Sequence, residues 1–305
     1  MKSPQLLTST AAAFALFASA PALADGHNEA AQATSETSGP ALWKVADEDT
    51  TIYLFGTVHM LPSDVDWNSG AVNEALASAQ TLVTELNLTP ETEPQIATSF
   101  QKAGLFADGN TLRSLMDDEQ RATFEGGLAK IGVEPEVFDP MEPWFASIVL
   151  FQIVATASGF TPDKGVEKVL EGLVGPDTER VALETIDQQI RVLDELPMDQ
   201  QLIYLLEFAA DPLEGIKGLN DIIAVWTKGD AEGVGQMVTE AVSGHPLLAE
   251  RLFYSRNSTW AKWIEMRLDT TPGTVFIAVG AGHLAGERSV QDMLSKRDIE
   301  VERVQ

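Results

Sequence analysis

Short apolar runs near both ends of the chain predict strands. Residues 42–46 and 51–55 alternate apolar and polar positions around the polar turn 47–49, which indicates a β-hairpin. The run at 274–279 (TVFIAV) is apolar throughout, as in a buried strand. Three further runs read as strands, the last of them an edge strand: 81–86, 180–184 and 299–304. The pattern therefore predicts a sheet built from both ends of the chain.

Helical periodicity covers most of the sequence between these strands. Helices are expected from Asp66 onward and over 111–130, 141–158, 163–173, most of 186–267, and 289–296. The segment 141–158 is almost entirely apolar, but Gln152 and its short length favour a buried helix over a membrane span. We therefore predict an α/β fold with a mixed, mostly parallel central sheet flanked by helices. A large helical insertion should separate the early strands from the last ones.

The first 24 residues have the features of an export signal. Lys2 supplies a positive charge, residues 6–20 are softly apolar, and Ala22 and Ala24 form a small pair before Asp25. An apolar run of about 15 residues is shorter than the roughly 20 that a membrane span requires. We expect cleavage after residue 24, a flexible polar leader over 25–40, one domain over 41–305, and a periplasmic or secreted location.

Charge and cysteine content exclude several classes of function. The chain of 305 residues has 46 Asp and Glu against 20 Lys and Arg, a formal net charge of −26. This charge argues against nucleic acid and anionic membrane surfaces as partners, because both require basic patches. Cysteine is absent, which excludes disulfides, thiolate metal sites and thiol nucleophiles. Oligomeric state does not follow from these data.

Two similar turns follow the early and late apolar strands. The segment 52–60 (IYLFGTVHM) resembles 276–284 (FIAVGAGHL), and each passes from a strand into Gly-x-x-His and an apolar residue. Glycine at a strand end permits a tight turn, and ligands bind at the carboxyl ends of strands in open α/β sheets. The chain has only four histidines, so two at matched positions mark His59 and His283 as candidate site residues. We expect their imidazoles to face one cavity.

Two glutamates end apolar strands in the same way. Glu85 lies in TLVTELNL and Glu184 follows RVAL. A carboxylate in a buried strand is costly unless it is paired or bound. With two imidazoles, one or two carboxylates suit a divalent metal ion, and without metal they suit a histidine base oriented by a carboxylate. Both glutamates are also compatible with capping loops and helix N-termini.

Arg256 and Asn257 lie inside a helical stretch rich in aromatic residues. Tyr254 and Trp260 flank the arginine, whose stem is compatible with packing on an apolar surface while the head stays solvated. The alternative is a clamp on a developing anion.

Taken in order, these motifs resemble the TraB/GumN family. The matching segments are LWKV, YLFGTVHMLP, LVTELNL, LETIDQQ, RNSTWA and FIAVGAGHLAG, spread from about Leu42 to Val304. Relatives of that family include the Tiki membrane-anchored proteases and, more remotely, erythromycin esterase-like and ChaN-like proteins. The resemblance implies an α/β fold with a helical insertion and a hydrolase-like site. The resemblance implies that His59, Glu85 and His283 belong to this site, together with Glu184, Arg256 and Asn257.

The resemblance leaves three functions open. Tiki-like members are metal-dependent proteases, erythromycin esterase-like members hydrolyse esters without metal, and ChaN-like members bind haem. We expect first a metal-dependent peptidase in which His59, Glu85 and His283 hold a divalent ion and polarise a peptide carbonyl. Glu184 would then act as general base or orient a ligand, Arg256 would stabilise the oxyanion, and Asn257 would belong to the catalytic group. Unlike the membrane-anchored relatives, this chain has no later segment apolar enough to span a membrane, so a soluble protein acting on a peptide or small molecule is expected.

The N-terminal pattern gives a direct test. Mass spectrometry of the protein purified from its native host should find a mature N-terminus near Asp25, because the small pair Ala22 and Ala24 precedes that position. Intact Met1 on protein recovered from the cytoplasm would show that the segment is not a cleaved signal.

Overall fold

A computed structural model describes residues 39–305, so the expected signal and most of the leader lie outside the described residues. One main sheet has the strand order β6-β4-β7-β2-β1-β8. Strands β6, β4, β7 and β2 are mutually parallel, whereas β1 and β8 are antiparallel to their neighbours. The strands are β1 (Leu42–Ala46), β2 (Thr50–Thr57), β3 (Leu61–Pro62), β4 (Thr81–Thr84), β5 (Phe160–Thr161), β6 (Glu179–Ala182), β7 (Gly273–Gly280) and β8 (Glu302–Arg303). The expected mixed, mostly parallel sheet is confirmed.

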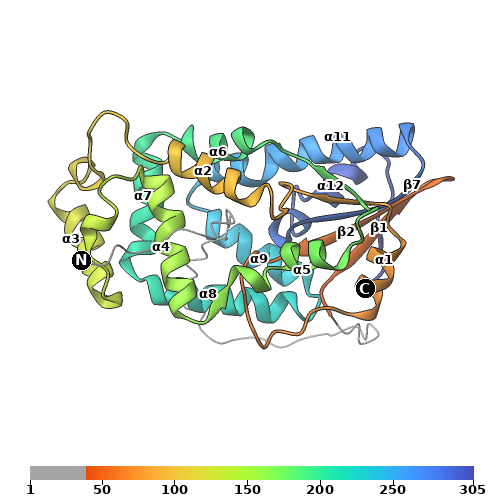
Figure 1. Ribbon diagram of the computed structural model, residues 1–305, viewed down its shortest axis with the longest axis horizontal. Helices are drawn as coiled ribbons and strands as arrows, with labels where there is room; N and C mark the ends of the chain where they lie inside the picture. Colours follow the sequence, from red (N-terminus) through yellow and green to blue (C-terminus); the bar gives the residue numbers. More distant parts are fainter. Residues whose placement is uncertain (1–38) are drawn as a thin grey trace.

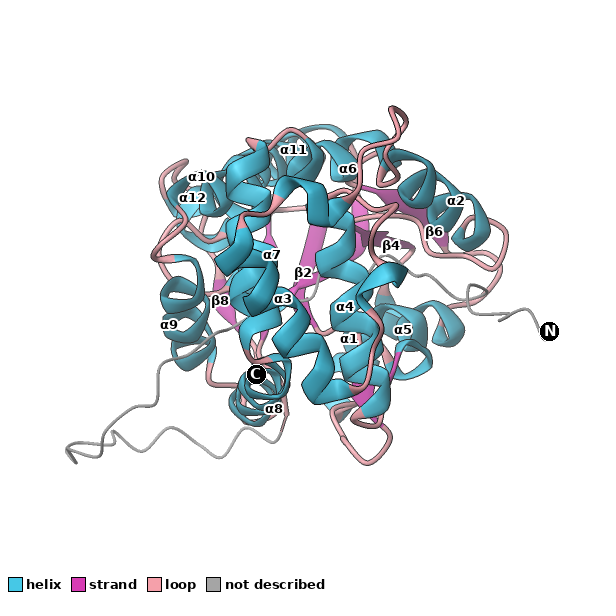
Figure 2. Ribbon diagram, turned by 90° about the vertical axis from the view of Figure 1, so that its left-hand side faces the viewer, coloured by secondary structure: helices cyan, strands magenta, loops and turns pink. Residues whose placement is uncertain are grey.

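Most of the segment between β4 and β7 is helical. The α-helices are α1 (Gly70–Ser78), α2 (Glu93–Ala103), α3 (Asp118–Ile131), α4 (Pro143–Ala157), α5 (Val166–Leu173), α6 (Ile186–Asp194), α7 (Met198–Ala210), α8 (Pro212–Trp226), α9 (Ala231–Val242), α10 (Pro246–Ala249), α11 (Ser255–Thr270) and α12 (Val290–Ser295). A π-helical turn, Glu250–Tyr254, joins α10 to α11. Helices α3, α4 and α7 lie at one end of the long axis and the sheet at the other (Figure 1). Seen from that helical end, the same three helices stand in front of the strands (Figure 2).

Each face of the sheet buries its own apolar core, because successive side chains of a strand point to opposite faces. Ile52 of β2 and Ile277 of β7 pack with Trp260 and Ile264 of α11. On the opposite face, Phe55, Phe276 and helix α1 join the larger core that extends into the helical insertion. Strand β7 is apolar throughout because both of its faces are covered, Phe276 by one core and Ile277 by the other.

Several element boundaries differ from the sequence expectation for local reasons. Helix α1 begins only at Gly70, because the Ser69 hydroxyl accepts the backbone N–H of Val72 and caps it there, while Trp67 is buried in the core. Strand β4 ends at Thr84. The Thr84 hydroxyl donates to the carbonyl of Leu86 at 2.7 Å, and this local hydrogen bond accompanies a turn of the backbone. Glu85 therefore lies just beyond the strand end and not within the strand.

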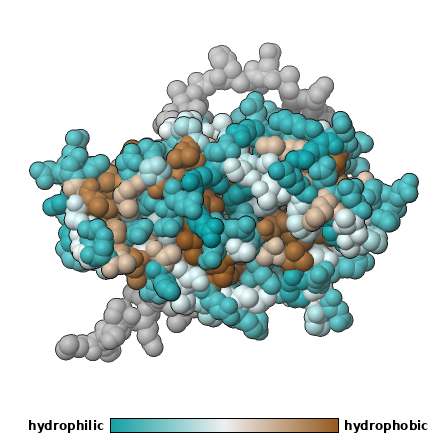
Figure 3. Space-filling model, turned by 90° about the horizontal axis from the view of Figure 1, so that it is seen from above, coloured by the Kyte–Doolittle hydropathy of each residue, from teal (hydrophilic) through white to brown (hydrophobic). Residues whose placement is uncertain are grey.

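The described part of the chain contains no helix long and apolar enough to cross a membrane. The apolar segment predicted over 141–158 forms α4, which begins at Pro143 and is buried along most of its length. Viewed from above, the described surface is mainly hydrophilic, and its hydrophobic areas are separated from one another (Figure 3). These features agree with α4 serving as a core helix of the insertion.

Two adjacent glycines of α3 provide a matched test of packing in the insertion. A Cβ on Gly127 would lie 1.6 Å from the carbonyl oxygen of Ala209 in α7, whereas a Cβ on Gly126 would meet nothing within 4 Å. Gly127→Ala should therefore lower the free energy of unfolding by about 1–3 kcal/mol. Gly126→Ala should raise it by about 0.5–1 kcal/mol, because alanine is the better helix former. Denaturant titrations of both variants would check this, and equal effects would contradict the close α3–α7 contact.

Candidate active site

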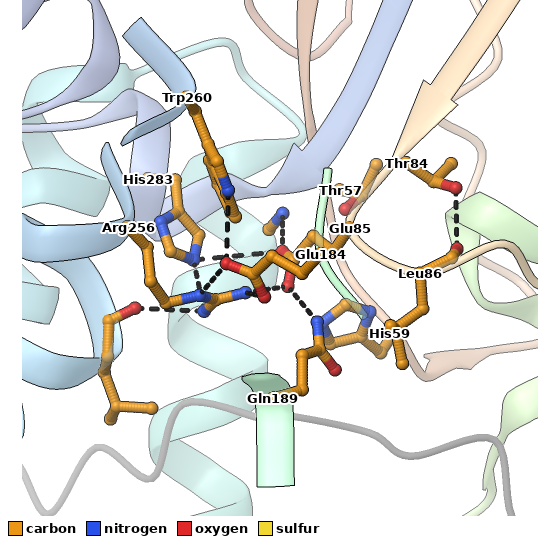
Figure 4. A network of polar contacts seen from close by, with 12 residues as sticks. Thr57, His59, Thr84, Glu85, Leu86, Glu184, Gln189, Arg256, Trp260 and His283 are labelled. Atoms are coloured by element: carbon orange, nitrogen blue, oxygen red, sulfur yellow. Dashed lines mark hydrogen bonds and ion pairs between the residues drawn. The ribbon is translucent and has the colours of Figure 1, made fainter. Parts of the chain in front are cut away.

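Four predicted residues meet at the carboxyl ends of the parallel strands. His59 follows β2, Glu85 follows β4, Glu184 follows β6, and His283 lies in the 3₁₀ turn Ala281–Leu284 that follows β7. Because these strands are parallel neighbours, their ends lie at one edge of the sheet. In Figure 4, Glu85 and Glu184 lie between the two imidazoles.

Gly280 shows how closely the two histidines approach. A Cβ at this residue would lie 3.3 Å from Glu85 Oε1, 3.5 Å from His283 Cδ2 and 3.9 Å from His59 Nε2. Both imidazoles therefore lie within 4 Å of one point, together with the Glu85 carboxylate. The spatial convergence that the paired turns predicted is present, and the absence of a side chain at Gly280 leaves room for it.

Arg256 of α11 binds the two predicted glutamates. Its Nε donates to Glu184 Oε1 at 2.7 Å, and its Nη2 donates to Glu184 Oε2 at 2.9 Å and to Glu85 Oε2 at 2.5 Å. Its Nη1 donates to the carbonyl of Leu252 at 3.0 Å and contacts His283 Nε2 at 3.1 Å. These contacts engage all of the N–H donors that a guanidinium has. Arg256 therefore holds the glutamates and His283 in place, and it would have to exchange a partner to bind an oxyanion.

The contact with Arg256 fixes the protonation of His283. A guanidinium only donates, so Nε2 of His283 is the accepting nitrogen and Nδ1 carries the proton. Nδ1 then donates to Asn257 Oδ1 at 2.6 Å, and Asn257 Nδ2 donates to the carbonyl of Arg288 at 2.8 Å. Burial and the positive charge of Arg256 lower the pKa of His283 to about 3. His283 is therefore neutral at neutral pH.

His59 has the opposite environment. Its Nδ1 donates to Glu167 Oε1 at 2.7 Å, and the Thr57 hydroxyl donates to the same oxygen. Burial disfavours the charged imidazole, but the Glu167 carboxylate outweighs this effect and raises the pKa of His59 to about 9. The Nε2 atom makes no hydrogen bond with any residue among 39–305, and the side chain is 17% exposed, against 5–8% for Glu85, Glu184, Arg256 and His283. His59 thus presents an unengaged nitrogen to the site.

The backbone supports the pairing of His59 with Glu167. The N–H of Val166 donates to the carbonyl of Val58 at 3.0 Å, which ties the start of α5 to the turn after β2. A Cβ on Gly165 would lie only 2.2 Å from the carbonyl oxygen of His59. This close approach places Glu167, in the first turn of α5, beside the imidazole.

Glu85 is held as a carboxylate by donors from three elements. Gly280 N donates to Oε1 at 2.8 Å, and Gln189 Nε2 of α6 donates to Oε2 at 3.1 Å, beside the bond from Arg256. Burial alone would raise the pKa of Glu85, but the charge of Arg256 holds that pKa well below its usual range. The two glutamates in turn raise the pKa of Arg256 against the effect of burial. Each charge in this group is thus stabilised by the others.

Four residues of this arrangement escaped the sequence analysis: Glu167, Gln189, Trp260 and Gly280. Glu167 lies in the first turn of a helix, where acidic residues are common, so nothing in its pattern distinguished it. Trp260 was noted only as a neighbour of Arg256, but its Nε1 donates to Glu184 Oε1 at 3.1 Å. Gly280 is the glycine of the second Gly-x-x-His turn, so that motif was the sequence feature that could have identified it as a site residue.

The donor set does not fit the metal ion expected between His59, Glu85 and His283. The Nε2 lone pair of His283 and Oε2 of Glu85 already accept hydrogen bonds from Arg256, and a cation there would also be repelled by the guanidinium. Among the residues described, no group of three or more histidines and acidic residues is arranged to hold a metal ion. In the described arrangement, Arg256 uses lone pairs that a metal ion at this position would need.

Two cavities border the site. One of about 420 Å³ lies beside Glu184, with Asn87, Thr92 and Asp187 in its lining. The other, of about 40 Å³, is lined by His59, Gly280 and apolar side chains of the helical insertion. The larger space is therefore next to Glu184, and the smaller one is next to His59.

Comparisons with known proteins agree with the motifs. The chain is 23% identical to an uncharacterized protein of Treponema pallidum over 273 residues, which cover 84% of this chain and 80% of that protein. It is also 23% identical to the uncharacterized protein YbaP of Escherichia coli, with coverages of 79% and 87%. The metalloprotease TIKI2 of Danio rerio is 23% identical over 82% of this chain and 58% of its own length. No solved structure matches the chain.

The sequence profile of the TraB/PrgY/gumN family matches residues 41–303, nearly all of the described chain. The paired Gly-x-x-His turns and the glutamates at the strand ends lie within that range. The chain therefore belongs to the TraB/PrgY/gumN family.

Proposed function

We propose that this protein is a hydrolase that cleaves peptide bonds, with His59 as the residue that transfers protons. The observation that carries the proposal is the pair formed by His59 and the buried Glu167, which leaves the imidazole Nε2 directed at a site bordered by cavities. A histidine oriented by a carboxylate is the arrangement used for general base catalysis. The resemblance to a relative named as a metalloprotease supports a peptide as the substrate.

In this mechanism His59 activates a water molecule. The neutral Nε2 takes a proton from the water as its oxygen attacks the carbonyl carbon of the scissile bond. The resulting imidazolium is stabilised by the Glu167 carboxylate at 2.7 Å, and its Nε2 proton passes to the leaving nitrogen as the C–N bond breaks. Glu167 thus positions the ring and stabilises its charged form, without contacting the substrate.

Hydrogen bonds between Arg256 and its partners hold the side chains of the site in position. His283 is neutral and bonded at both nitrogens, and both carboxylates of Glu85 and Glu184 accept from Arg256. We therefore assign Arg256, Glu184, Asn257 and His283 as positioning residues. This differs from the roles expected from the sequence, in which Glu184 was a base and Arg256 an oxyanion clamp.

A metal-dependent peptidase is the second candidate function, and the name of the relative TIKI2 favours it. In that case His59, Glu85 and His283 would be the ligands, and Arg256 would have to leave the lone pairs that it occupies here. Both candidate functions share one expectation about location. If residues 1–24 act as an export signal, the proposed substrates lie in the periplasm or outside the cell.

The role of His59 gives a pH-dependent prediction. Because only the neutral imidazole accepts a proton and the pKa of His59 is about 9, kcat/KM should rise with pH and level off above about 9. Glu167→Gln removes the negative charge that raises this pKa, so the rising limb should move to lower pH while the maximal rate falls. His59→Ala should lower kcat by roughly 10²–10⁴-fold. The measurement is a pH–rate profile on blocked peptide anilides.

His245→Ala is the matched control for these variants. His245, just before α10, also pairs with a glutamate, Glu207 of α7, at 2.7 Å, but neither residue lines the cavities that border the site. The control should keep the wild-type profile. A rising limb that stays in place in Glu167→Gln would contradict the proposed pair, and full activity in His59→Ala would remove the proposed function.

Chelation separates the two candidate functions. Because Arg256 occupies the lone pairs that a metal would use, we expect full peptidase activity after exhaustive treatment with EDTA and desalting. Activity that is lost and then restored by Mn²⁺ or Zn²⁺ would favour the metal-dependent candidate. Metal content would then be measured in the double variant His59→Ala, His283→Ala, where wild-type metal content would place the ion elsewhere.

A further inference from the structure

The cavity beside His59 has an apolar wall from three helices of the insertion. Phe151 of α4, Leu219 and Ile222 of α8, and Val234 of α9 line it together with His59. The sheet contributes Gly280 and Ala281, at the end of β7, to the same lining. The cavity therefore joins the helical insertion to the candidate active site.

From this geometry we infer that the cavity is a specificity pocket for a small aliphatic side chain of the substrate. The inference rests on the proposed hydrolase function and names the class of residue that it selects. The side chain belongs to the residue that supplies the scissile carbonyl. The occupant follows from the polarity, the size and the position of the cavity.

The polarity of the lining excludes charged and strongly polar occupants. Among residues 39–305, no acidic, lysine or arginine side chain lines the cavity. Thr57 is a polar residue of the lining, but its hydroxyl donates to Glu167 and is engaged. A polar group buried in such a pocket would lose its hydration without gaining a partner, whereas an aliphatic group gains free energy from the same burial.

The size of the cavity limits the occupant to a few carbon atoms. Its volume of about 40 Å³ identifies a small cavity, with room for a few water-sized groups. Three or four carbon atoms correspond to the side chain of valine or leucine. The benzyl side chain of phenylalanine, with seven carbons, would require the wall to move.

The position of the cavity brings its occupant to the reacting atoms. Gly280 lines the cavity, and the Cβ that it lacks would lie 3.9 Å from His59 Nε2. A side chain seated in the cavity therefore leaves its own backbone carbonyl close to the imidazole. The pocket and His59 lie at the same edge of the sheet. A substrate whose side chain fits the pocket is therefore held with its scissile bond near the imidazole.

The test uses N-acetyl amino acid p-nitroanilides with glycine, alanine, valine, leucine, phenylalanine and aspartate side chains. We expect kcat/KM for valine or leucine to exceed that for glycine and for phenylalanine by at least about tenfold, since each buried methylene contributes about 0.8 kcal/mol. Aspartate should be the poorest substrate. Equal kcat/KM across the aliphatic and aromatic series would overturn the pocket.

Two variants change the pocket in opposite directions. Val234→Phe fills it and should abolish the preference for leucine over glycine. Ile222→Ala enlarges it and should raise kcat/KM for phenylalanine relative to leucine by at least about tenfold. Ile203→Ala on α7 is the control, because Ile203 is exposed and outside the cavity, and it should leave the ratio unchanged. Unchanged selectivity in Ile222→Ala would overturn the pocket even if Val234→Phe fails to fold.

A binding measurement keeps this test separate from the test of the proposed function. The acids N-acetyl-leucine and N-acetylglycine are titrated into the wild type and Ile222→Ala, with affinity followed by calorimetry or ligand-observed NMR. If no anilide is hydrolysed, the proposed function fails, but N-acetyl-leucine should still bind at least about tenfold more tightly than N-acetylglycine in the wild type. Equal affinities for the two acids would overturn the pocket whatever the activity.

Discussion

The buried guanidinium of Arg256 is the interaction on which the rest of the site depends. A charge removed from water is costly unless partners replace its hydration, and Arg256 is 7% exposed. Its partners come from the ends of β4, β6 and β7 and from the π-helical turn before α11. Glu85 and Arg256 are 171 residues apart in sequence, so this one side chain joins the early and late parts of the chain. Removing Arg256 would leave the buried carboxylates of Glu85 and Glu184 without this cation.

The two Gly-x-x-His turns occupy equivalent places but put their histidines in opposite states. His283 faces a guanidinium, and its pKa falls to about 3, whereas His59 faces a carboxylate, and its pKa rises to about 9. Their Nδ1 atoms are held alike, by Asn257 in one case and by Glu167 in the other. The turn fixes where each imidazole lies, and the neighbouring helix fixes its charge. A repeated motif thereby supplies one neutral imidazole bonded at both nitrogens and one imidazole paired with a carboxylate.

The helical insertion contributes polar side chains to the site as well as apolar core. Helix α5 supplies Glu167, α6 supplies Gln189, α11 supplies Arg256, and α8 and α9 wall the cavity beside His59. The indole N–H of Trp226, the last residue of α8, donates to the carbonyl of Gly56 at 2.8 Å and ties the insertion to β2. The sheet thus presents the strand ends, and the helices decide what lies opposite them.

Much of the architecture could be predicted from sequence because it depends on local patterns. Apolar alternation indicated β1 and β2, and an uninterrupted apolar run indicated β7. The apolar run with Pro143 indicated α4, and the paired turns indicated that His59 and His283 converge. Helix α2 and the short pair β3 and β5 were not predicted. The turn of Thr84 toward Leu86, which places Glu85 beyond its strand, depends on one hydroxyl bond that periodicity does not encode.

By itself the sequence determined the fold class, the family resemblance and the identity of the residues at the strand ends, because strand and turn patterns involve neighbouring residues. Only the tertiary structure decided the role of each residue. The hydrogen-bonding role of an imidazole depends on side chains that folding brings together from distant segments. The same holds for the number of arginine N–H groups that remain without a partner. Glu167 lies 108 positions after His59 in an ordinary helical first turn, so no local pattern marked it as the partner of that histidine.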